Sequence, residues 1–393
     1  MSTPKIRFKG FTDDWEQWKL KELVEDLSTG KSVNSTDELV GENDIGVLKT
    51  SCVSYDFFDA NECKKVVTEE IGYVKCPVEK NCIIVSRMNT PERVGACGFV
   101  DKDYPNLYLP DRLWKLKFLD KYDVRMIHCM LISPYYKADI LSLASGTSGS
   151  MYNISKEDFE NIELKVPSKD EQLVISKLFN NLDSLITLHQ RKCDELQKVK
   201  KYMLQKMFPK KGEKVPELRF VGFTGDWEER KLEDIYSFQY GEFNTNPDNG
   251  GEYPIYGANG IIGGYTNFNA ESSAVIGHMG AYAGYVVWAE GKHFVTYNGT
   301  IAKPVNDSTD SKFGFYLLSS KQIYRICAGS GQPFISYNDL NKIEATIPSS
   351  KEEQTTIGKY FTNLDNLIIL HQRKHDTLKE IKKYMLQNMF PKG

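Results

Sequence analysis

The sequence predicts an α+β protein built from two copies of one plan, and three observations support this fold class. Residues 168–210 recur at 350–392 with a constant offset of 182 and about two-thirds of the positions identical. A second segment, 4–23, recurs at 216–235. Between these repeats, short β-rich runs alternate with turns. Such self-similarity indicates the architecture before any single motif does.

Each copy of the longer repeat is predicted to form one long helix. Ser168 with Glu171, and Ser350 with Glu353, match the capping box that satisfies free amide donors at a helix start. No Gly or Pro interrupts the first copy before Pro209, so the helix could reach roughly 55–60 Å. Apolar residues recur at spacings of three and four, as in a coiled-coil seam. The predicted seam includes Leu178, Leu182, Leu185, Leu196, Leu364, Leu367 and Leu378.

The stretches between the repeats differ from each other. The first, roughly 24–155, has β-rich runs at 45–50, 64–68, 81–87 and 112–118, which fit a small mixed sheet. The second is rich in Gly and aromatic residues over 252–304, as expected for short strands joined by tight turns. Shared ends with divergent middles indicate a fixed frame that carries a replaceable insert.

Composition and charge limit the class of protein. The 393 residues leave room for two or three domains. There is no long apolar run and no signal-like start, so a cytoplasmic protein is expected. The eight cysteines include no Cys-x-x-Cys pair, which favours free thiols over zinc or disulfides. Residues 1–167 and 216–349 carry net charges of −5 and −6, against +5 and +3 for 168–215 and 350–393. A stand-alone nucleic-acid binder usually has a basic excess, so any DNA contact must come from a local patch or share its charge with a partner.

No catalytic residue and no metal ligand is predicted. Residues 29–32 resemble the end of a phosphate-binding loop, but Glu25 stands where its opening glycine would be. Asp158, Glu163 and Lys165 have a nuclease-like spacing, yet the second copy lacks the lysine. The string nearest to the tetrapeptide of amino-methyltransferases is 246–248, which does not match it.

Recognition chemistry is the remaining candidate. Some residue types can hydrogen-bond base edges in the major groove. Such residues follow a predicted strand of the first half and stand on predicted turns of the second half. These candidate DNA-binding residues are Arg87, Asn89, Thr90, Arg93, Asn259, His278, Tyr282, Asn298 and Gln332. The alternative is that they only cap turns and make loops polar.

The doubled segments resemble a known family, the specificity subunits of type I restriction-modification systems. The resemblance covers nearly the whole chain and rests on PKIRFKGFTDDWE with PELRFVGFTGDWE, on the doubled long helix, and on YGANGIIGGY with VIGHMGAYAG. It implies two globular target-recognition domains with small mixed, twisted sheets and helices, joined by two long helices packed as an antiparallel coiled coil about an internal pseudo-two-fold axis. The expected boundaries are 1–167 and 211–349 for the domains, with 168–210 and 350–393 for the central and distal helices.

The resemblance also implies a non-catalytic subunit. It would recognise a bipartite sequence in double-stranded DNA, one domain per half-site, and bind two modification (methyltransferase) subunits and the restriction (motor-nuclease) subunits. No cofactor is expected in this chain, because S-adenosylmethionine, ATP and Mg²⁺ would belong to the partner subunits. Two alternatives remain: a stand-alone DNA methyltransferase or nuclease with an unrecognised site, and a duplicated coiled-coil adaptor that binds only protein.

Antiparallel packing about a pseudo-dyad would bring equivalent residues together at the helix centre. His189 and its counterpart His371 are therefore expected to be neighbours there, where the apolar seam turns polar. A polar layer weakens packing but can fix the register of a coiled coil.

Overall fold

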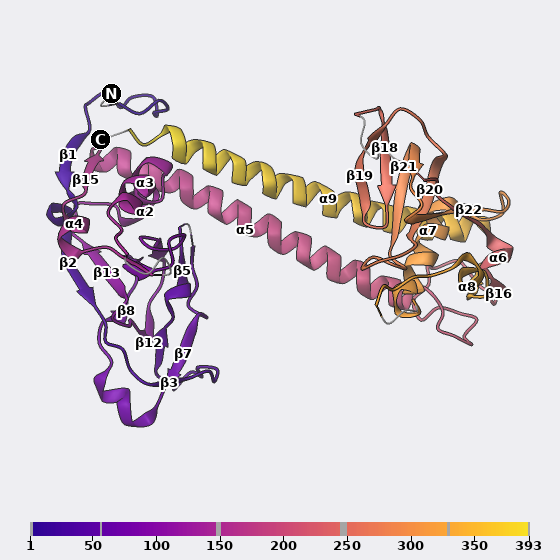
Figure 1. Ribbon diagram of the computed structural model, residues 1–393, viewed down its shortest axis with the longest axis horizontal. Helices are drawn as coiled ribbons and strands as arrows, with labels where there is room; N and C mark the ends of the chain where they lie inside the picture. The colour runs from indigo at the N-terminus through magenta and orange to yellow at the C-terminus, as the bar shows by residue number, and fades with distance from the viewer. Residues whose placement is uncertain (1–2, 56, 147–150, 244–249, 328–330, 392–393) are drawn as a thin grey trace. The chain divides into compact units, whose positions relative to one another are not determined.

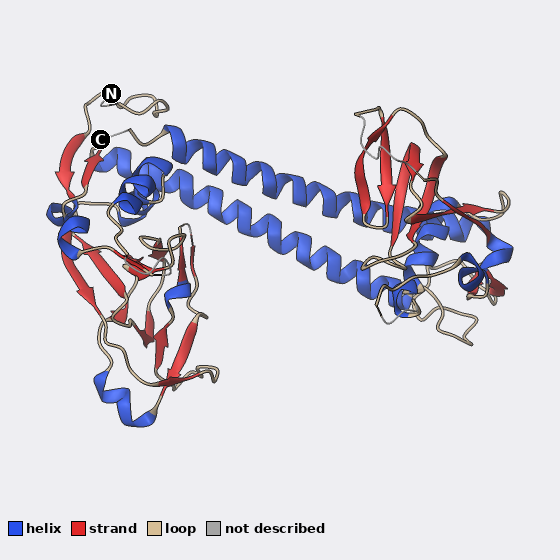
Figure 2. Ribbon diagram, viewed as in Figure 1, coloured by secondary structure: helices blue, strands red, loops and turns tan. Residues whose placement is uncertain are grey.

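The computed structural model describes residues 3–55, 57–146, 151–243, 250–327 and 331–391 (Figure 1). The string at 246–248 lies outside them. The chain divides into two compact units: 1–188 with 374–393, called unit one here, and 189–373, called unit two. Both units combine strands and helices (Figure 2). The predicted α+β fold class is confirmed.

The two long helices are α5, Lys169–Lys206, and α9, Lys351–Asn388, each of 38 residues. Their halves pair antiparallel inside each unit. In unit one, Phe179 stacks on Phe390 with ring centroids 6.1 Å apart, and Asp183 meets Lys382. In unit two, residue 189 meets residue 371, and Lys200 meets Asp365. The predicted antiparallel helix pair is confirmed.

The carboxylates of the predicted capping boxes have other partners. Glu171 is 1% exposed and accepts two hydrogen bonds of 2.8 Å from Arg7. Glu353 accepts two, of 2.7 and 2.8 Å, from Arg219. A buried carboxylate needs such a bidentate partner to offset its lost hydration. At the start of α9 the amide of Glu353 donates to the Ser350 hydroxyl at 3.3 Å, as in the predicted capping box. The arginine partners of the two carboxylates come from distant segments, which a short sequence pattern could not reveal.

A frame of short elements recurs in both units. An edge strand pairs antiparallel with the strand that precedes each long helix, and one-turn helices flank this pair. In unit one the frame is β1 Glu16–Lys19, α1 Leu20–Leu23, α4 Lys156–Glu160 and β15 Glu163–Val166. In unit two it is β16 Glu228–Lys231, α6 Leu232–Ile235, α8 Tyr337–Asn341 and β23 Glu344–Ile347.

The first insert forms two main sheets. One is four-stranded in the order β11-β9-β13-β2, and the other is five-stranded in the order β3-β7-β4-β12-β8. The second is mixed, because β12 pairs parallel with β4 and antiparallel with β8. The four strands are Val24–Thr29 (β2), Cys82–Ser86 (β9), Cys97–Val100 (β11) and Leu113–Phe118 (β13). The five are Ser35–Thr36 (β3), Gly46–Leu48 (β4), Cys63–Val66 (β7), Pro77–Val78 (β8) and Tyr104–Tyr108 (β12).

Smaller elements complete unit one. Two short antiparallel pairs join β5 with β6 and β10 with β14. These strands are Val53–Ser54 (β5), Phe57–Phe58 (β6), Met88–Asn89 (β10) and Tyr152–Asn153 (β14). The helices are α2, Val124–Leu131, and α3, Pro134–Ser142, and two 3₁₀ turns are Thr50–Cys52 and Thr68–Tyr73.

The second insert is a single six-stranded sheet in the order β17-β22-β20-β21-β18-β19. Its strands are Tyr236–Tyr240 (β17), Tyr253–Gly257 (β18), Gly260–Tyr265 (β19), Ala270–Gly277 (β20), Val286–Val295 (β21) and Gly299–Pro304 (β22). The sheet curls, because Glu242, just after β17, forms a bridge with Thr296, just after β21. The helix α7, Ser311–Ser320, and the 3₁₀ turn Ile323–Arg325 lie beside it.

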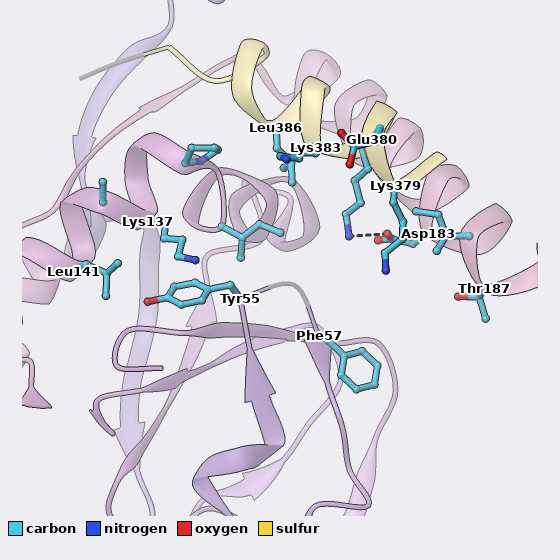
Figure 3. A pocket seen from close by; sticks show the side chains of 15 residues that line it. Tyr55, Phe57, Lys137, Leu141, Asp183, Thr187, Lys379, Glu380, Lys383 and Leu386 are labelled. Atoms are coloured by element: carbon cyan, nitrogen blue, oxygen red, sulfur yellow. Dashed lines mark ion pairs between the residues drawn. The ribbon is translucent and has the colours of Figure 1, made fainter. Parts of the chain in front are cut away.

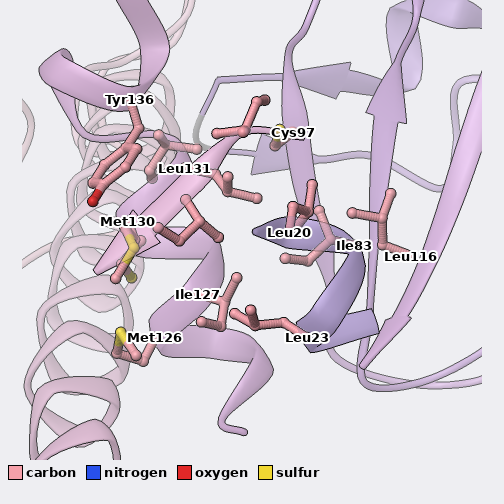
Figure 4. Close-up of a cluster of buried hydrophobic side chains, with 14 of the residues drawn as sticks. Leu20, Leu23, Ile83, Cys97, Leu116, Met126, Ile127, Met130, Leu131 and Tyr136 are labelled. Atoms are coloured by element: carbon pink, nitrogen blue, oxygen red, sulfur yellow. The ribbon is translucent and has the colours of Figure 1, made fainter. Parts of the chain in front are cut away.

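The Met-Phe pair at the end of each long helix belongs to a core. Met389 and Phe390 lie in the core of unit one, where Phe390 meets Trp15 edge to face at 6.4 Å. Phe208 meets Trp227 at 6.4 Å in the core of unit two. Figure 4 shows part of the first core, in which side chains of α1, α2 and the four-stranded sheet converge. Aromatic rings bury large apolar areas, so these ends anchor each helix to the frame.

Candidate nucleic-acid interface

In unit two, several loops meet at one end of the six-stranded sheet. The backbone amide of His278 donates to the carbonyl of Asn298 at 2.8 Å. The amide of Gly280 donates to the carbonyl of Pro333 at 2.8 Å, and that of Ile335 donates to the carbonyl of His278 at 3.0 Å. Loops 278–285, 296–298 and 331–337 are thereby fixed to one another.

Close backbone approach explains Gly277, the last residue of β20, and Gly284 in the loop that follows. A Cβ at Gly277 would lie 2.1 Å from the carbonyl oxygen of Tyr282 and 3.1 Å from that of Ala258, so loop 258–260 joins the same cluster. Gly284 has φ +76°, and a Cβ there would lie 2.4 Å from the amide nitrogen of Tyr324. Only glycine fits both positions without strain.

The structure brings all five candidates of the second half to this end of the sheet. Asn259, Tyr282 and Gln332 are exposed, whereas His278 and Asn298 are partly buried. We call this set of loops the second-domain loop cluster. Sequence reasoning missed its exposed aromatic side chains, because their positions become neighbours only in the fold. They are Phe243, Tyr297, Phe334 and Tyr337.

In unit one, Arg87 is anchored at the end of β9. Its Nε donates to the carbonyl of Asp111 at 2.8 Å, and its guanidinium group lies 5.9 Å from the ring centroid of Trp114. Its terminal nitrogens make no hydrogen bond with the residues that the structure describes. A guanidinium fixed at Nε can present its other donors to a ligand.

Asn89 differs from the other candidates of the first half. It is 7% exposed; its amide nitrogen lies 3.0 Å from the Ser86 hydroxyl, and its oxygen accepts from the amide of Thr90 at 2.8 Å. Its polar groups therefore stabilise the turn. Thr90 and Arg93 are exposed in the same turn, and the amide of Arg93 donates to the carbonyl of Thr90 at 3.0 Å.

The helix centre contains the two predicted histidines in contact. Nδ1 of His189 lies 2.9 Å from Nδ1 of His371, so one ring donates and the other accepts. Cys193, one turn along α5, is buried. The predicted seam is only partly buried. Leu182 and Leu364 are buried, Leu178, Leu196 and Leu378 are partly buried, and Leu185 and Leu367 are 42% and 44% exposed.

Each unit has a cleft beside its helix pair. In unit one the cleft, of about 920 Å³, is lined by Tyr55, Phe57, Asp183, Ile186, Lys382 and Leu386 (Figure 3). In unit two a cleft of about 390 Å³ is lined by Asp365, Ile368, Lys200 and Leu204. These four stand at the repeat offset of 182 from Asp183, Ile186, Lys382 and Leu386. We call these the helix clefts, and sequence reasoning did not predict them.

The residues of the rejected motifs make structural contacts. The hydroxyl of Thr29 donates to the carbonyl of Leu113 at 2.9 Å. Asp158 accepts from the Ser155 hydroxyl at the start of α4, and Glu163 accepts from Gln17 at 2.6 Å. Within the described ranges, no group of three or more His, Cys, Asp and Glu side chains could hold a metal ion.

Other chemistry can be described for the same part of the chain. All eight cysteines are among the described residues, and all are free thiols. Burial raises the pKa of Cys129 to about 11 and that of Cys97 to about 12, so neither thiol ionises readily. No described helix combines the length and apolar character needed to cross a bilayer.

Comparisons with known proteins identify the family. A model of the type I restriction modification DNA specificity domain matches residues 12–198 and 224–380. The MjaVIII specificity subunit of Methanocaldococcus jannaschii is 26% identical over 284 residues, 62% of this chain and 65% of that protein. This chain thus spans just under two-thirds of that relative. The putative MjaX specificity subunit of the same organism is 21% identical over 95% of this chain and 92% of its own length.

Solved structures share the fold. The S subunit of a type I restriction-modification system from M. genitalium has a TM-score of 0.65 at 21% identity, over 99% of both chains. A chain from a study of complex assembly in the type I system has a TM-score of 0.54 at 14% identity, over 96% of this chain and 98% of its own. The specificity-domain match occurs twice and covers most of the sequence. The chain therefore belongs to the family of type I restriction-modification specificity subunits.

Proposed function

We propose that this chain recognises a bipartite double-stranded DNA sequence, with one domain for each half-site. One observation carries the proposal: the same frame supports two different inserts. The strand pairs β1–β15 and β16–β23 are equivalent, as are α5 and α9. The inserts between them have a four-stranded plus a five-stranded sheet in one case and a six-stranded sheet in the other. Two equivalent frames that carry different inserts fit a DNA target whose two half-sites differ in sequence. The functional domains would be 1–167 and 211–349, with 168–210 and 350–393 as supporting helices.

The candidate base contacts follow from exposure. In the first domain we propose Arg87, Thr90 and Arg93 as contacts and Asn89 as the residue that positions their turn. In the second domain we propose the loop cluster, with Asn259, His278, Tyr282, Asn298 and Gln332. Amides and guanidinium groups discriminate bases in the major groove. The acidic net charge of both domains suggests that partner subunits supply much of the phosphate contact.

The partners would be two modification subunits, one at each helix cleft. The repeated lining of the clefts, and the exposure of Leu185 and Leu367 at equivalent positions, support two similar docking sites. Exposed leucines on a helix are favourable contacts for a second helix. These subunits would bind S-adenosylmethionine and methylate adenine. Restriction subunits would bring ATP and Mg²⁺, and this chain itself would be non-catalytic.

Two measurements test this proposal together. A methyltransferase should co-purify with the tagged chain from its host. Mass spectrometry should find two copies of it per chain. Mapping of methylated adenines in that host should give one split consensus sequence, which disappears when the gene is deleted. Capture of other proteins without a methyltransferase would favour the adaptor alternative. Methylation by the purified chain alone would favour the stand-alone enzyme.

A further inference from the structure

The side chain of His278 presents one chemically defined edge. Its Nδ1 lies 2.7 Å from the carbonyl oxygen of Ile335. A carbonyl oxygen only accepts hydrogen bonds, so Nδ1 must carry the hydrogen. In the neutral ring, Nε2 then has a lone pair and no hydrogen. The fold has therefore selected the tautomer in which the outer nitrogen is an acceptor.

The orientation of this ring is fixed by its surroundings. The ring of Tyr240 lies against it with centroids 4.3 Å apart, and Tyr337 packs on Tyr240 at 4.9 Å. The backbone of His278 is bonded on both sides, to Asn298 and to Ile335. The residue is partly exposed, and no described residue hydrogen-bonds its Nε2. A rigid acceptor without a partner is preorganised for a ligand, because binding costs it little conformational entropy.

His293 in the same domain shows what a purely structural histidine looks like. It is fully buried, its Nδ1 lies 2.8 Å from the carbonyl oxygen of Gly291, and its Nε2 lies 3.0 Å from the Ser273 hydroxyl. Both histidines use Nδ1 on a backbone carbonyl. Of these two histidines, His293 also has a hydrogen-bond partner for Nε2 among the described residues, whereas His278 does not. The two side chains therefore differ in the state of Nε2.

We infer, on the basis of the proposed function, that His278 accepts a hydrogen bond from an exocyclic amino group in the major groove. It would thus select adenine or cytosine at one position of the second domain's half-site. Adenine N6 and cytosine N4 are the donors in that groove, whereas guanine N7 and O6 and thymine O4 are acceptors. An acceptor on the protein would face an acceptor on the wrong base, which is repulsive.

The test is selection of bound duplexes from a pool of random sequence, using the complex of this chain with its modification subunits. Wild type is compared with His278→Asn and His278→Arg. The shorter Asn amide can still donate to Ile335 but has no acceptor at the position of Nε2. Arg has only donors, which pair with guanine. We expect adenine or cytosine in wild type, a roughly tenfold loss of selectivity at that one position for Asn, and guanine for Arg.

A second arm changes the DNA and keeps the same two proteins, wild type and His278→Asn. In the selected wild-type sequence, the adenine is replaced by purine, or the cytosine by 2-pyrimidinone, which removes only the amino group. Wild type should bind this duplex roughly tenfold more weakly, and His278→Asn should bind it and the parent duplex equally.

The outcomes separate this inference from the proposed function. A split consensus that does not change with residue 278, or unchanged wild-type binding to every analogue duplex, would overturn the inference alone. A wild-type complex that selects no split sequence would overturn the proposed function and the inference with it.

Discussion

Asp183 in unit one and Asp365 in unit two occupy equivalent positions. Each has one partner that is the same in both units and one partner that differs. Each pairs with the equivalent lysine of the opposite helix half, Lys382 at 2.8 Å and Lys200 at 2.6 Å. On the side of the insert, Asp183 meets the guanidinium group of Arg125, whereas Asp365 accepts from the Tyr316 hydroxyl at 2.7 Å.

The difference shows how one helix can support unlike domains. A carboxylate can accept several hydrogen bonds from cationic or neutral donors. The helix thus offers an acceptor that does not require a particular insert. The clamps between Arg7 and Glu171 and between Arg219 and Glu353, by contrast, are the same in both units.

The largest expected effect comes from breaking a constant clamp. Glu171→Gln should lower the stability of unit one by about 3–5 kcal/mol, because it leaves Arg7, whose side chain is 15% exposed, without its counter-charge. Native-state hydrogen exchange, read by mass spectrometry on peptides of each unit, measures the change locally. The double variant Arg7→Met with Glu171→Met should lose less than the single variant. An equal or greater loss in the double variant would contradict this explanation.

The variable contacts should contribute unequally. Arg125 bonds to Asn180 at 3.0 Å and to His128 at 2.8 Å in addition to Asp183, so Arg125→Met should cost unit one about 2–3 kcal/mol. Tyr316→Phe removes one neutral donor, while Lys200 stays with Asp365, and should cost unit two about 1 kcal/mol. Hydrogen exchange of the two variants tests the ranking, and the reverse order would refute it.

Each unit should lose stability in acid through a buried histidine. Burial, with Arg125 beside the ring, keeps the pKa of His128 well below its usual value. Burial lowers the pKa of His293 as well. Because the unfolded chain binds these protons more readily, stability is complete above about pH 6.5 and is lost as the pH falls below it. The loss can reach about 1.4 kcal/mol per pH unit per histidine.

The free energies of opening from native-state hydrogen exchange at pH 7 and 5.5, corrected for the pH dependence of the intrinsic exchange rate, check this expectation. His128→Gln should flatten the pH dependence of unit one and leave that of unit two unchanged. An unaltered slope in the variant would contradict the assignment to His128.

The smallest expected effect concerns the helix centre. His371→Leu should cost about 1 kcal/mol, because His189 loses a hydrogen-bond partner at a partly buried position. Replacing both histidines by leucine should cost less than the sum of the two single replacements, since neither ring is then left without the other. A double-mutant cycle on hydrogen exchange of unit two measures this coupling. Additive losses would mean that the contact between the rings contributes nothing.

The frame could be predicted because its sequence is repeated. The inserts are not repeated, so their structure could not be predicted in the same way. The helix pair follows from a constant offset, and the meeting of His189 with His371 follows from its symmetry. The clamps join residues 164 and 134 positions apart, which no local pattern reveals. The strand order within the inserts could not be predicted either, because it also depends on contacts between residues far apart in the sequence. The inward turn of Asn89 and the exposed Leu185 depend on tertiary packing, which residue type and spacing alone do not encode.

In the proposed function, constant supports carry independent DNA-binding inserts. The most direct test replaces residues 24–155 with the corresponding insert of a relative that has a different target and maps the adenines methylated by the reconstituted complex. One half-site should change to that of the donor while the other half-site stays the same. Change in both half-sites, or in neither, would contradict it.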